Sequence, residues 1–344
     1  MNTIVQSLPE LLLPWFAENR RDLPWRHTRD PYAIWISEIM LQQTRVEAVK
    51  GYYARFLSAL PTVSALAQAD DDFLRKLWEG LGYYTRVRNL KKAAMVLVQE
   101  YGGAFPRDYT QVLALPGIGE YTAGAICSIA FDQPTPAVDG NVLRVMARLL
   151  ADSRPIQLPA LKREVRQLLS AVYPPHACGA FTQALMELGA TVCLPNGQPR
   201  CDLCPMAGLC RAYAAQAVSA YPVTAPKRPK KEVDLTVFLL DYDGKIAVSQ
   251  RENRGLLAGL WEFPNTPGHL PEQQALNLLS EAQLSPRALL CQMQREHVFT
   301  HVIWHMRAYR ISCGAPGQLT WMEPERIQAE IPLPTAFRQF WEFF

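Results

Sequence analysis

Four cysteines gather in one short stretch of the chain, and their thiolates could bind a soft metal. The stretch "CLPNGQPRCDLCPMAGLC" has the pattern C-x7-C-x2-C-x5-C, formed by Cys193, Cys201, Cys204 and Cys210. Structural zinc sites commonly pair their ligands in two close knuckles, whereas this stretch has a single C-x-x-C. One loop that supplies all four thiolates is typical of a cysteine-ligated [4Fe-4S] cluster. The spacing therefore favours an iron–sulfur cluster, with zinc and disulfides as the alternatives.

Two carboxylates stand in unlike surroundings. In "WISEIML" the helical neighbours of Glu38 are mostly apolar, which would raise its pKa and suit a general acid. Asp139 in "AVDGNVLRV" precedes a helix-compatible run, and the N-terminus of a helix would keep it ionised. One protonated and one ionised carboxyl is the arrangement that cleaves a glycosidic bond. The alternatives are an exposed glutamate on a polar helix edge and a plain N-cap aspartate.

Two further stretches could contact a polyanion. "LPGIGEYTAGAI" places Gly117 and Gly119 in a tight turn before a helix, whose first N–H groups attract anions. "GLGYYTRVRNLKKA" (80–93) interleaves Tyr83 with cations such as Arg86, a mixture that can stack on bases and neutralise phosphates. Each also has a structural interpretation, as a helix–turn–helix corner or as the charged face of an amphipathic helix.

The elements that would carry these residues change character part-way along the chain. The first part reads as helices, one of them with Asp30 as N-cap and Pro31 as its first residue. "YPVTAPKRPKKE" has no apolar period and reads as a linker. After it, "EVDLTVFLLDYDGKIAVSQR" predicts a β-hairpin around "DYDGK", and "EQQALNLLSEAQ" predicts a helix. We therefore expect a helical domain at 1–216, a basic linker at 217–232 and an α+β domain at 233–344.

Composition limits the environment and the partners. The chain has 344 residues, 49% of them apolar, with no signal-peptide pattern and no apolar run long enough for a membrane span. We expect a reducing bacterial cytoplasm, where disulfides are rare, and no membrane partner. The net charge is +3 in residues 1–216, +3 in the linker and −3 in the rear domain. This asymmetry indicates surfaces with different partners but does not by itself establish nucleic acid.

Taken together, these motifs resemble one family. A hairpin "LPGIG", an aspartate roughly twenty residues later and a four-cysteine loop are similar to the helix–hairpin–helix DNA glycosylases that carry an iron–sulfur cluster. Within them, "SEIMLQQTRV", "GLGYYTRVRNL" and "VDGNVLRV" resemble the adenine DNA glycosylase family, which removes adenine misincorporated opposite 8-oxoguanine. The resemblance covers most of residues 25–212. It implies an all-α helix–hairpin–helix domain with a [4Fe-4S] loop, followed by an α+β Nudix-like domain.

The resemblance also implies catalytic roles. Glu38 would protonate the departing adenine at N7, and Asp139 would stabilise the cationic sugar. Tyr121 and Asn141 would orient and polarise the groups around Asp139. Endonuclease III-like enzymes carry a lysine where this chain has Tyr121, and a tyrosine cannot form a Schiff base. The resemblance therefore implies a monofunctional glycosylase, in which water completes the hydrolysis of adenine's N-glycosidic bond.

Other positions match the DNA contacts of the family. Gln43 and Tyr83 correspond to residues that wedge into the base stack or contact the 8-oxoguanine strand. Arg86, Gly117 and Gly119 are further candidates for contact with DNA. The expected partner is duplex DNA with adenine opposite 8-oxoguanine or guanine, from which the base is flipped. We expect the enzyme to act as a monomer.

The rear domain resembles the Nudix-like domain with which the family recognises 8-oxoguanine. "HVFTHV" matches the F-S-H loop of the family, with Thr300 in place of serine, and His301 would probe the lesion. No R-E-x-x-E-E run occurs in residues 233–344, so the carboxylates of an active Nudix hydrolase are missing. We therefore expect a reader of the opposing base and not a second enzyme.

Two departures and two rival interpretations accompany this assignment. The first cysteine gap has seven residues where the family commonly has six, and Thr300 leaves open how strongly 8-oxoguanine is preferred over guanine. One rival is a glycosylase of the same fold that excises a damaged pyrimidine or a mismatched thymine. The other is a catalytically silent DNA-binding protein. "SEIMLQQT" and the rear domain argue against the first, and the presence of both Glu38 and Asp139 argues against the second.

Overall fold

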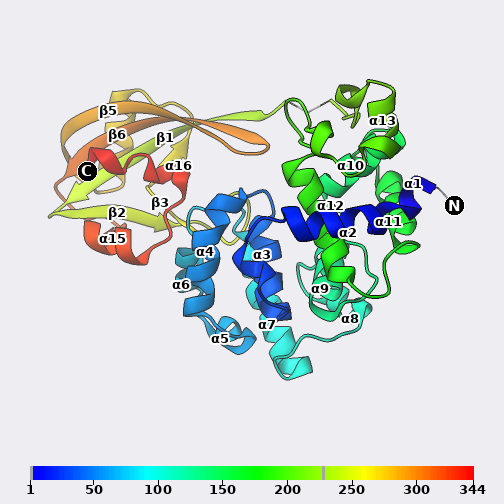
Figure 1. Ribbon diagram of the computed structural model, residues 1–344. Coiled ribbons are helices and arrows are strands. Elements are labelled where there is room, and N and C mark those ends of the chain that lie inside the picture. Colours follow the sequence, from blue (N-terminus) through cyan, green and yellow to red (C-terminus); the bar gives the residue numbers. More distant parts are fainter. Residues whose placement is uncertain (1–2, 227–228) are drawn as a thin grey trace. The chain divides into compact units, whose positions relative to one another are not determined.

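The computed structural model describes residues 3–226 and 229–344 and divides into two compact units (Figure 1). Unit 1 contains residues 3–68 and 88–226, and unit 2 contains residues 69–87 and 229–344. Residues 227 and 228 of the predicted linker lie outside the described residues. Elsewhere in the predicted linker, the chain forms the 3-10 turn η4 (Val218–Ala220) and begins a strand at Lys231.

Unit 1 is helical and has no strand among its described residues. Besides η4, its short 3-10 turns are η1 (Pro24–Arg26), which precedes a long buried helix, and η2 (Cys201–Leu203) and η3 (Ala207–Leu209) in the cysteine loop. Its helices are α1 (Thr3–Gln6), α2 (Leu8–Asn19), α3 (Pro31–Leu41), α4 (Val46–Ala59), α5 (Val63–Gln68), α8 (Tyr109–Ala114), α9 (Glu120–Phe131), α10 (Gly140–Leu150), α11 (Pro159–Ser170), α12 (Cys178–Thr191) and α13 (Arg211–Ala214). Helix α7 (Thr85–Tyr101) begins in unit 2 and continues into unit 1.

Helix α3 starts as its sequence predicts. The side chain of Asp30 accepts a hydrogen bond from the N–H of Tyr32 at 3.0 Å, and Pro31 occupies the first helical position. The helix ends at Leu41, and Gln43 has a left-handed backbone with φ +58°. A new helix, α4, starts three residues later. The backbone reversal at Gln43 therefore separates α3 from α4 within a stretch that looks helical throughout.

The core of unit 1 holds α2, α10 and α12 together. Leu12, Val145 and Phe181 belong to one buried apolar cluster that these helices share. Helix α9 packs between α3 and α12, so its buried face contacts both helices. This packing fixes three helices, α3, α9 and α10, which carry the candidate catalytic residues.

Unit 2 is built on one mixed sheet with the strand order β3-β2-β1-β6-β5. Strands β1 and β6 run parallel, and every other pairing in the described sheet is antiparallel. The strands are β1 (Lys231–Tyr242), β2 (Lys245–Gln250), β3 (Trp261–Glu262), β4 (Asn265–Pro267), β5 (Pro286–Val298), β6 (Val302–Cys313) and β7 (Thr320–Met322). The predicted hairpin is confirmed, since Asp243 and Gly244 make a two-residue turn with positive φ between β1 and β2.

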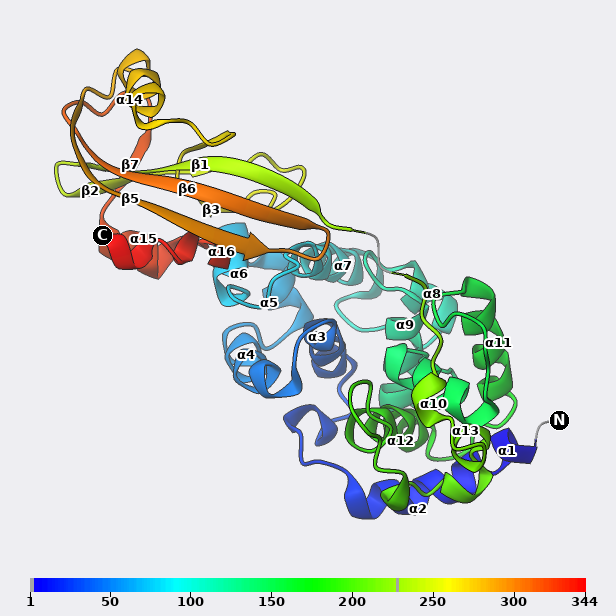
Figure 2. The same ribbon diagram turned by 90° about the horizontal axis from the view of Figure 1, so that it is seen from above.

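Both faces of this sheet are covered by helices (Figure 2). Val237 and Leu239 of β1 pack in the cluster that contains α15 (Pro324–Glu330) and α16 (Thr335–Arg338). Phe238 and Leu240 face the opposite cluster, which contains α14 (Glu272–Glu281). The alternation follows the period-two geometry of a strand. The helix predicted from "EQQALNLLSEAQ" is therefore confirmed as α14.

Helix α6 (Asp71–Leu77) and the turn after it belong to unit 2, although their sequence lies among the helices of unit 1. The C-terminal residues end in the 3-10 turn η5 (Trp341–Phe343). None of the described helices combines the length and apolar composition that a membrane-spanning helix needs.

Candidate active site

Glu38 lies in the middle of α3, where eight neighbouring residues of the helix are buried with it. Its side chain is not on a polar edge, because only 5% of the residue is exposed. Burial raises the pKa of Glu38 to about 7, and the negative charge of Asp139 adds to this rise. A hydrogen bond from Tyr121 and the charge of Arg26 act in the opposite direction. The raised pKa expected from the apolar neighbours is confirmed.

Asp139 is the N-cap of α10. Its Oδ1 accepts the N–H of Val142 at 2.8 Å, and its Oδ2 accepts the side-chain amide of Asn141 at 2.7 Å. Burial nevertheless raises the pKa of Asp139 above its ordinary value, against the lowering effect of these hydrogen bonds and of Arg144. The N–H groups at the helix N-terminus thus favour the charged form, as expected, but burial has the larger effect on the pKa. Both oxygens still face N–H donors, which favour the carboxylate form.

Tyr121, near the start of α9, contacts Glu38. Its hydroxyl donates a short hydrogen bond to Oε2 of Glu38, and burial raises the pKa of Tyr121 well above its ordinary value. The described hydrogen bond of Tyr121 goes to Glu38, and the negative charge of Asp139 also raises the pKa of Tyr121. Helices α3 and α9 pack against each other, and the hydrogen bond joins Tyr121 of α9 to Glu38 of α3. Asn141 does bond to Asp139, as expected.

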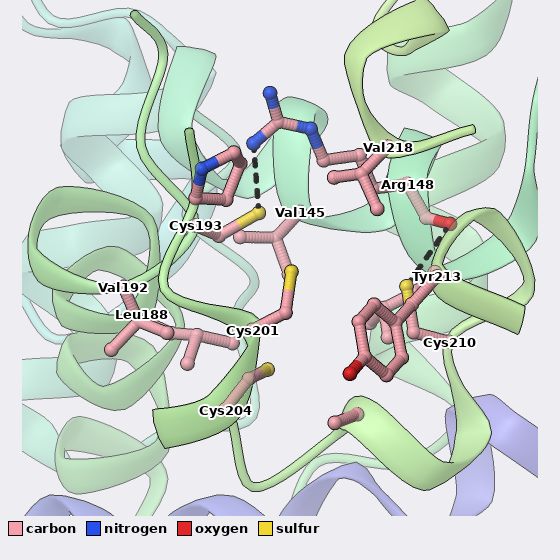
Figure 3. A pocket seen from close by; sticks show the side chains of 13 residues that line it. Val145, Arg148, Leu188, Val192, Cys193, Cys201, Cys204, Cys210, Tyr213 and Val218 are labelled. Carbon is pink, nitrogen blue, oxygen red and sulfur yellow. Dashed lines mark hydrogen bonds between the residues drawn. The ribbon is translucent and has the colours of Figure 1, made fainter. Parts of the chain in front are cut away.

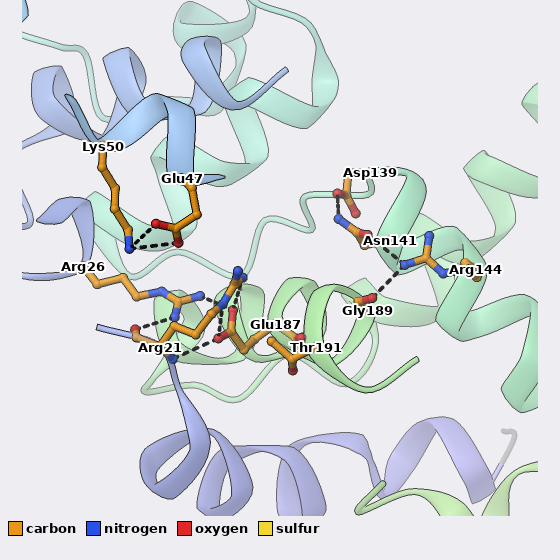
Figure 4. A network of polar contacts seen from close by, with 10 residues as sticks. All are labelled: Arg21, Arg26, Glu47, Lys50, Asp139, Asn141, Arg144, Glu187, Gly189 and Thr191. Carbon is orange, nitrogen blue, oxygen red and sulfur yellow. Dashed lines mark hydrogen bonds and ion pairs between the residues drawn. The ribbon is translucent and has the colours of Figure 1, made fainter. Parts of the chain in front are cut away.

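A buried arginine extends the Asp139 network along α10 (Figure 4). Nη2 of Arg144 donates to Oδ1 of Asn141 and to the carbonyl of Gly189, each at 2.8 Å. Its Nε donates to the carbonyl of Cys193 at 2.9 Å. Helix α12 comes close at Gly189, where a Cβ would lie 2.6 Å from Cβ of Asn141. Arg144 thus fixes the amide that in turn orients Asp139.

A buried ion cluster on the other side of α12 also bears on Glu38 (Figure 4). The Glu187 side chain is fully buried and accepts hydrogen bonds from Arg21 at 2.8–2.9 Å and from Arg26 at 2.7 Å. Arg26 is the cation that opposes the raised pKa of Glu38. The sequence analysis did not identify these residues or Arg144. The spacing of four between Arg144 and Arg148 in an otherwise apolar helix was a usable signal.

The glycine-rich hairpin links α8 to α9. Gly117 has φ +75°, and a Cβ there would lie 2.5 Å from Cβ of Asn89. Gly119 is the N-cap of α9 and offers no side chain to the first N–H groups of that helix. The turn and the open helix N-terminus match the predicted anion-binding geometry.

The four clustered cysteines line one pocket beside α10 and α12 (Figure 3). Their sulfurs point toward the same space, and Nη1 of Arg148 donates to Sγ of Cys193 at 3.3 Å. The seven-residue gap closes on itself, because the N–H of Arg200 bonds to the carbonyl of Val192 at 3.0 Å. The eight cysteines are all thiols. Among the described residues, no group of three or more His, Cys, Asp or Glu side chains is placed to hold a metal ion.

The remaining predicted residues fall into the two units. Gln43 is exposed at the end of α3 in unit 1. In unit 2, the hydroxyl of Tyr83 lies 2.5 Å from Oγ1 of Thr300, and His301 is the exposed neighbour of Thr300. Arg86 donates to the carbonyls of two residues of its own turn and lies over the Tyr83 ring. Each unit thus brings together one set of predicted residues.

Comparison with known proteins identifies the relationship. The mouse (Mus musculus) adenine DNA glycosylase is 36% identical to this chain over 96% of its length, and the match covers 77% of the mouse protein. The chain belongs to the adenine DNA glycosylase family. This glycosylase also matches the HhH-GPD superfamily of base excision DNA repair proteins at residues 36–175 and the NUDIX domain at residues 236–343. The expected combination of a helix–hairpin–helix domain and a Nudix-like domain is confirmed.

Two solved structures are each similar to somewhat less than two thirds of this glycosylase. A thermostable thymine-DNA glycosylase is 32% identical with a TM-score of 0.57, covering 62% of this chain and 98% of that one. A trapped endonuclease III–DNA covalent intermediate is 26% identical with a TM-score of 0.53, covering 63% of this chain and 99% of that one. Together these findings establish a DNA glycosylase of base excision repair.

Proposed function

We propose that this glycosylase hydrolyses the N-glycosidic bond of adenine paired with 8-oxoguanine or guanine in duplex DNA. The observation that carries the proposal is the pairing of two unlike carboxyls, Glu38 with a pKa of about 7 and Asp139 among N–H donors. The name of the mouse relative supports adenine as the excised base. We also propose that one chain suffices, because both sets of candidate residues come from the same chain.

In this mechanism Glu38 acts as the general acid. A pKa of about 7 leaves about half of its carboxyls protonated at neutral pH, so a proton is available without a large cost. Tyr121 donates to Oε2 and thereby holds the carboxyl in one orientation, which leaves Oε1 to carry the proton to N7 of the base. Protonation makes adenine a neutral leaving group, and the bonding electrons leave with it.

Asp139 then faces the cationic sugar that remains. A fixed negative charge in a buried site stabilises such a cation strongly, because little solvent screens it. Its two N–H donors hold the carboxylate in place before the reaction begins. Water adds to C1′ with one of its lone pairs, and the proton it loses as the sugar hydroxyl forms passes to the Glu38 carboxylate, which restores the acid. Tyr121 stands where related lyases carry an amine, so we propose hydrolysis alone, without strand cleavage.

We propose that Tyr83, Thr300 and His301 read the base opposite the adenine. The hydrogen bond between Tyr83 and Thr300 joins an exposed aromatic ring to the loop between β5 and β6. Thr300 keeps the hydroxyl that serine offers in the family motif. An exposed ring, a hydroxyl and an imidazole can stack on a base and bond to its edge. Gln43, Arg86, Gly117 and Gly119 are proposed as further duplex contacts.

We also propose that the cysteine pocket holds a [4Fe-4S] cluster. The donor set fits, because four soft thiol ligands line one space and Arg148 offers an N–H to one of the sulfurs. When bound, the cluster would hold the cysteine loop together through its four thiolate ligands. The charge of Arg148 would partly neutralise these thiolates. Iron and acid-labile sulfide analysis of the purified protein tests this assignment.

The function is tested with duplexes that carry adenine opposite 8-oxoguanine, adenine opposite guanine, or thymine opposite guanine. We expect strand breaks only after alkali and only with adenine, and we expect Glu38→Gln to abolish them while retaining duplex binding. Breaks before alkali would contradict a monofunctional enzyme. Release of thymine would instead favour the activity named for the similar solved structure.

A further inference from the structure

Residues 69–87 are anchored to the C-terminal part of unit 2 by two buried or half-buried charges. Nζ of Lys76 donates to the carbonyls of Gln328 and Ile331 at 2.5 and 3.1 Å. The Glu79 side chain is only 11% exposed and accepts the N–H of Leu333 at 3.0 Å. Residues separated by more than 250 positions are therefore joined by charge-assisted hydrogen bonds.

Further ion pairs strengthen the same anchor. Glu79 pairs with Lys76 at 3.0 Å and makes a short ion pair with Arg338 of α16. A nearly buried carboxylate with several cationic and N–H partners is worth more than an exposed pair, and its loss leaves those partners unsatisfied. Glu79 is thus the centre of the anchor.

The turn that follows Glu79 is braced internally. Nε1 of Trp78 donates to the carbonyl of Gly82 at 3.0 Å, and Trp78 is fully buried. Arg86 bonds to the same carbonyl at 3.1 Å, and its guanidinium lies over both Trp78 and Tyr83. A displacement at Glu79 would therefore reach Tyr83 through a short, hydrogen-bonded turn.

The other end of this turn meets the loop between β5 and β6. The Tyr83 hydroxyl contacts Thr300, and the loop is held by a hydrogen bond from the N–H of Phe299 to the carbonyl of Val302 at 2.8 Å. The carbonyl of His301 also accepts the N–H of Lys231 at 2.9 Å. One side of the contact thus depends on the sheet, and the other depends on the anchor of residues 69–87.

We propose that Glu79 is a positioning residue for opposing-base specificity, with Lys76 as its partner in anchoring Tyr83 against Thr300. The proposal rests on the proposed function, in which Tyr83, Thr300 and His301 read the opposing base. Glu79 touches no reacting group. Its loss should reduce the preference for 8-oxoguanine while leaving base release opposite guanine near its original rate.

Single-turnover adenine release from duplexes with 8-oxoguanine and with guanine tests this proposal. We expect Glu79→Ala to lower the ratio of the two rate constants on the order of tenfold, as loss of a charge-assisted hydrogen bond shifts an equilibrium. Glu79→Gln keeps an acceptor for Leu333 and should give an intermediate ratio. Lys76→Met removes the ammonium that donates to the carbonyls of Gln328 and Ile331, and it should lower the ratio as well.

The matched control is Glu342→Gln, which removes an exposed ion pair with Arg295 from the same unit. It should leave the ratio at the wild-type value. An unchanged ratio in both the Glu79 and Lys76 variants would overturn the positioning role while leaving the proposed function intact. Equal losses on both duplexes together with a lower Tm would show a purely structural role and also overturn it. A wild-type ratio near one would instead reject the proposed base reading.

Discussion

Removing the hydroxyl of Tyr121 should make Glu38 a weaker acid. The Tyr121 hydroxyl donates to Glu38, and this hydrogen bond is the largest influence that lowers the pKa of that carboxyl against its burial. A hydrogen bond to an ionised group is worth about 1.5–3 kcal/mol, which corresponds to about one to two pKa units. Because Glu38 is buried, solvent screens little of this effect. In Tyr121→Phe, the pKa of Glu38 should therefore rise from about 7 to about 8 or 9.

The sign of this change can be read from a pH profile. Protonated Glu38 is the active form in the proposed mechanism, so the single-turnover rate should fall above the pKa of Glu38, and protonation of Asp139 should cause a separate fall at the acid end. At pH 9 the wild type should release adenine about 100-fold more slowly than at its plateau, whereas Tyr121→Phe should lose about tenfold or less. The plateau of the variant should be lower, because a weaker acid transfers its proton less readily.

Base release from an adenine:8-oxoguanine duplex between pH 5 and pH 10 provides the assay. Tyr32→Phe is the matched control, because Tyr32 lies on the same helix and donates its buried hydroxyl to the carbonyl of Leu60 at 2.8 Å. That control should lower stability without moving the midpoint. A Tyr121→Phe midpoint that stays near 7 or moves to lower pH, in a folded variant, would refute this account of Glu38.

Two further substitutions test the scaffold. Hydrogen bonds from Arg21 and Arg26 outweigh burial and lower the pKa of Glu187 to about 2, so this stability is present above about pH 4.5 and is lost as pH falls toward 2. Glu187→Gln should lower the free energy of unfolding, measured in urea, by about 3 kcal/mol at pH 7 and by about 2 kcal/mol at pH 4. Equal losses at the two pH values would contradict this. Gly117→Ala should cost about 1–3 kcal/mol and weaken duplex binding, because its φ is +75° and its Cβ would meet Asn89. Gly119→Ala, with no atom within 4 Å of the added Cβ, is the control for stability, and a similar loss in the unfolding assay would argue against the steric cause.

Local patterns in the sequence predicted the parts of the fold that depend on local geometry. Asp30 and Pro31 start α3 as expected, because an N-cap and a fixed φ act over a few residues. The turn at Asp243 and Gly244 likewise defines the hairpin by its own backbone angles. The apolar neighbours of Glu38 predicted its burial, since they share one helix.

The polar network of the site could not be read in this way. Glu187 and Arg26 are 161 positions apart, and Tyr83 and Thr300 are 217 apart. No periodicity records which charged side chains meet across such separations, because each residue alone is compatible with a solvated helix face. The same limit applies to the hydrogen bond between Tyr121 and Glu38, which are 83 positions apart, whereas Asn141 lies two residues from its partner Asp139.

The division of labour between the two carboxyls follows from where each sits on its helix. Glu38 is in the middle of α3, where every backbone N–H is already used by the helix, so little besides Tyr121 can stabilise its charge. Asp139 precedes α10, where the N–H of Val142 has no helical partner and is free to bond to a carboxylate. The charge of Asp139 in turn raises the pKa of Glu38, which favours the proton there. In the proposed mechanism, the two helix positions therefore favour the proton on Glu38 and the charge on Asp139 before any substrate is bound.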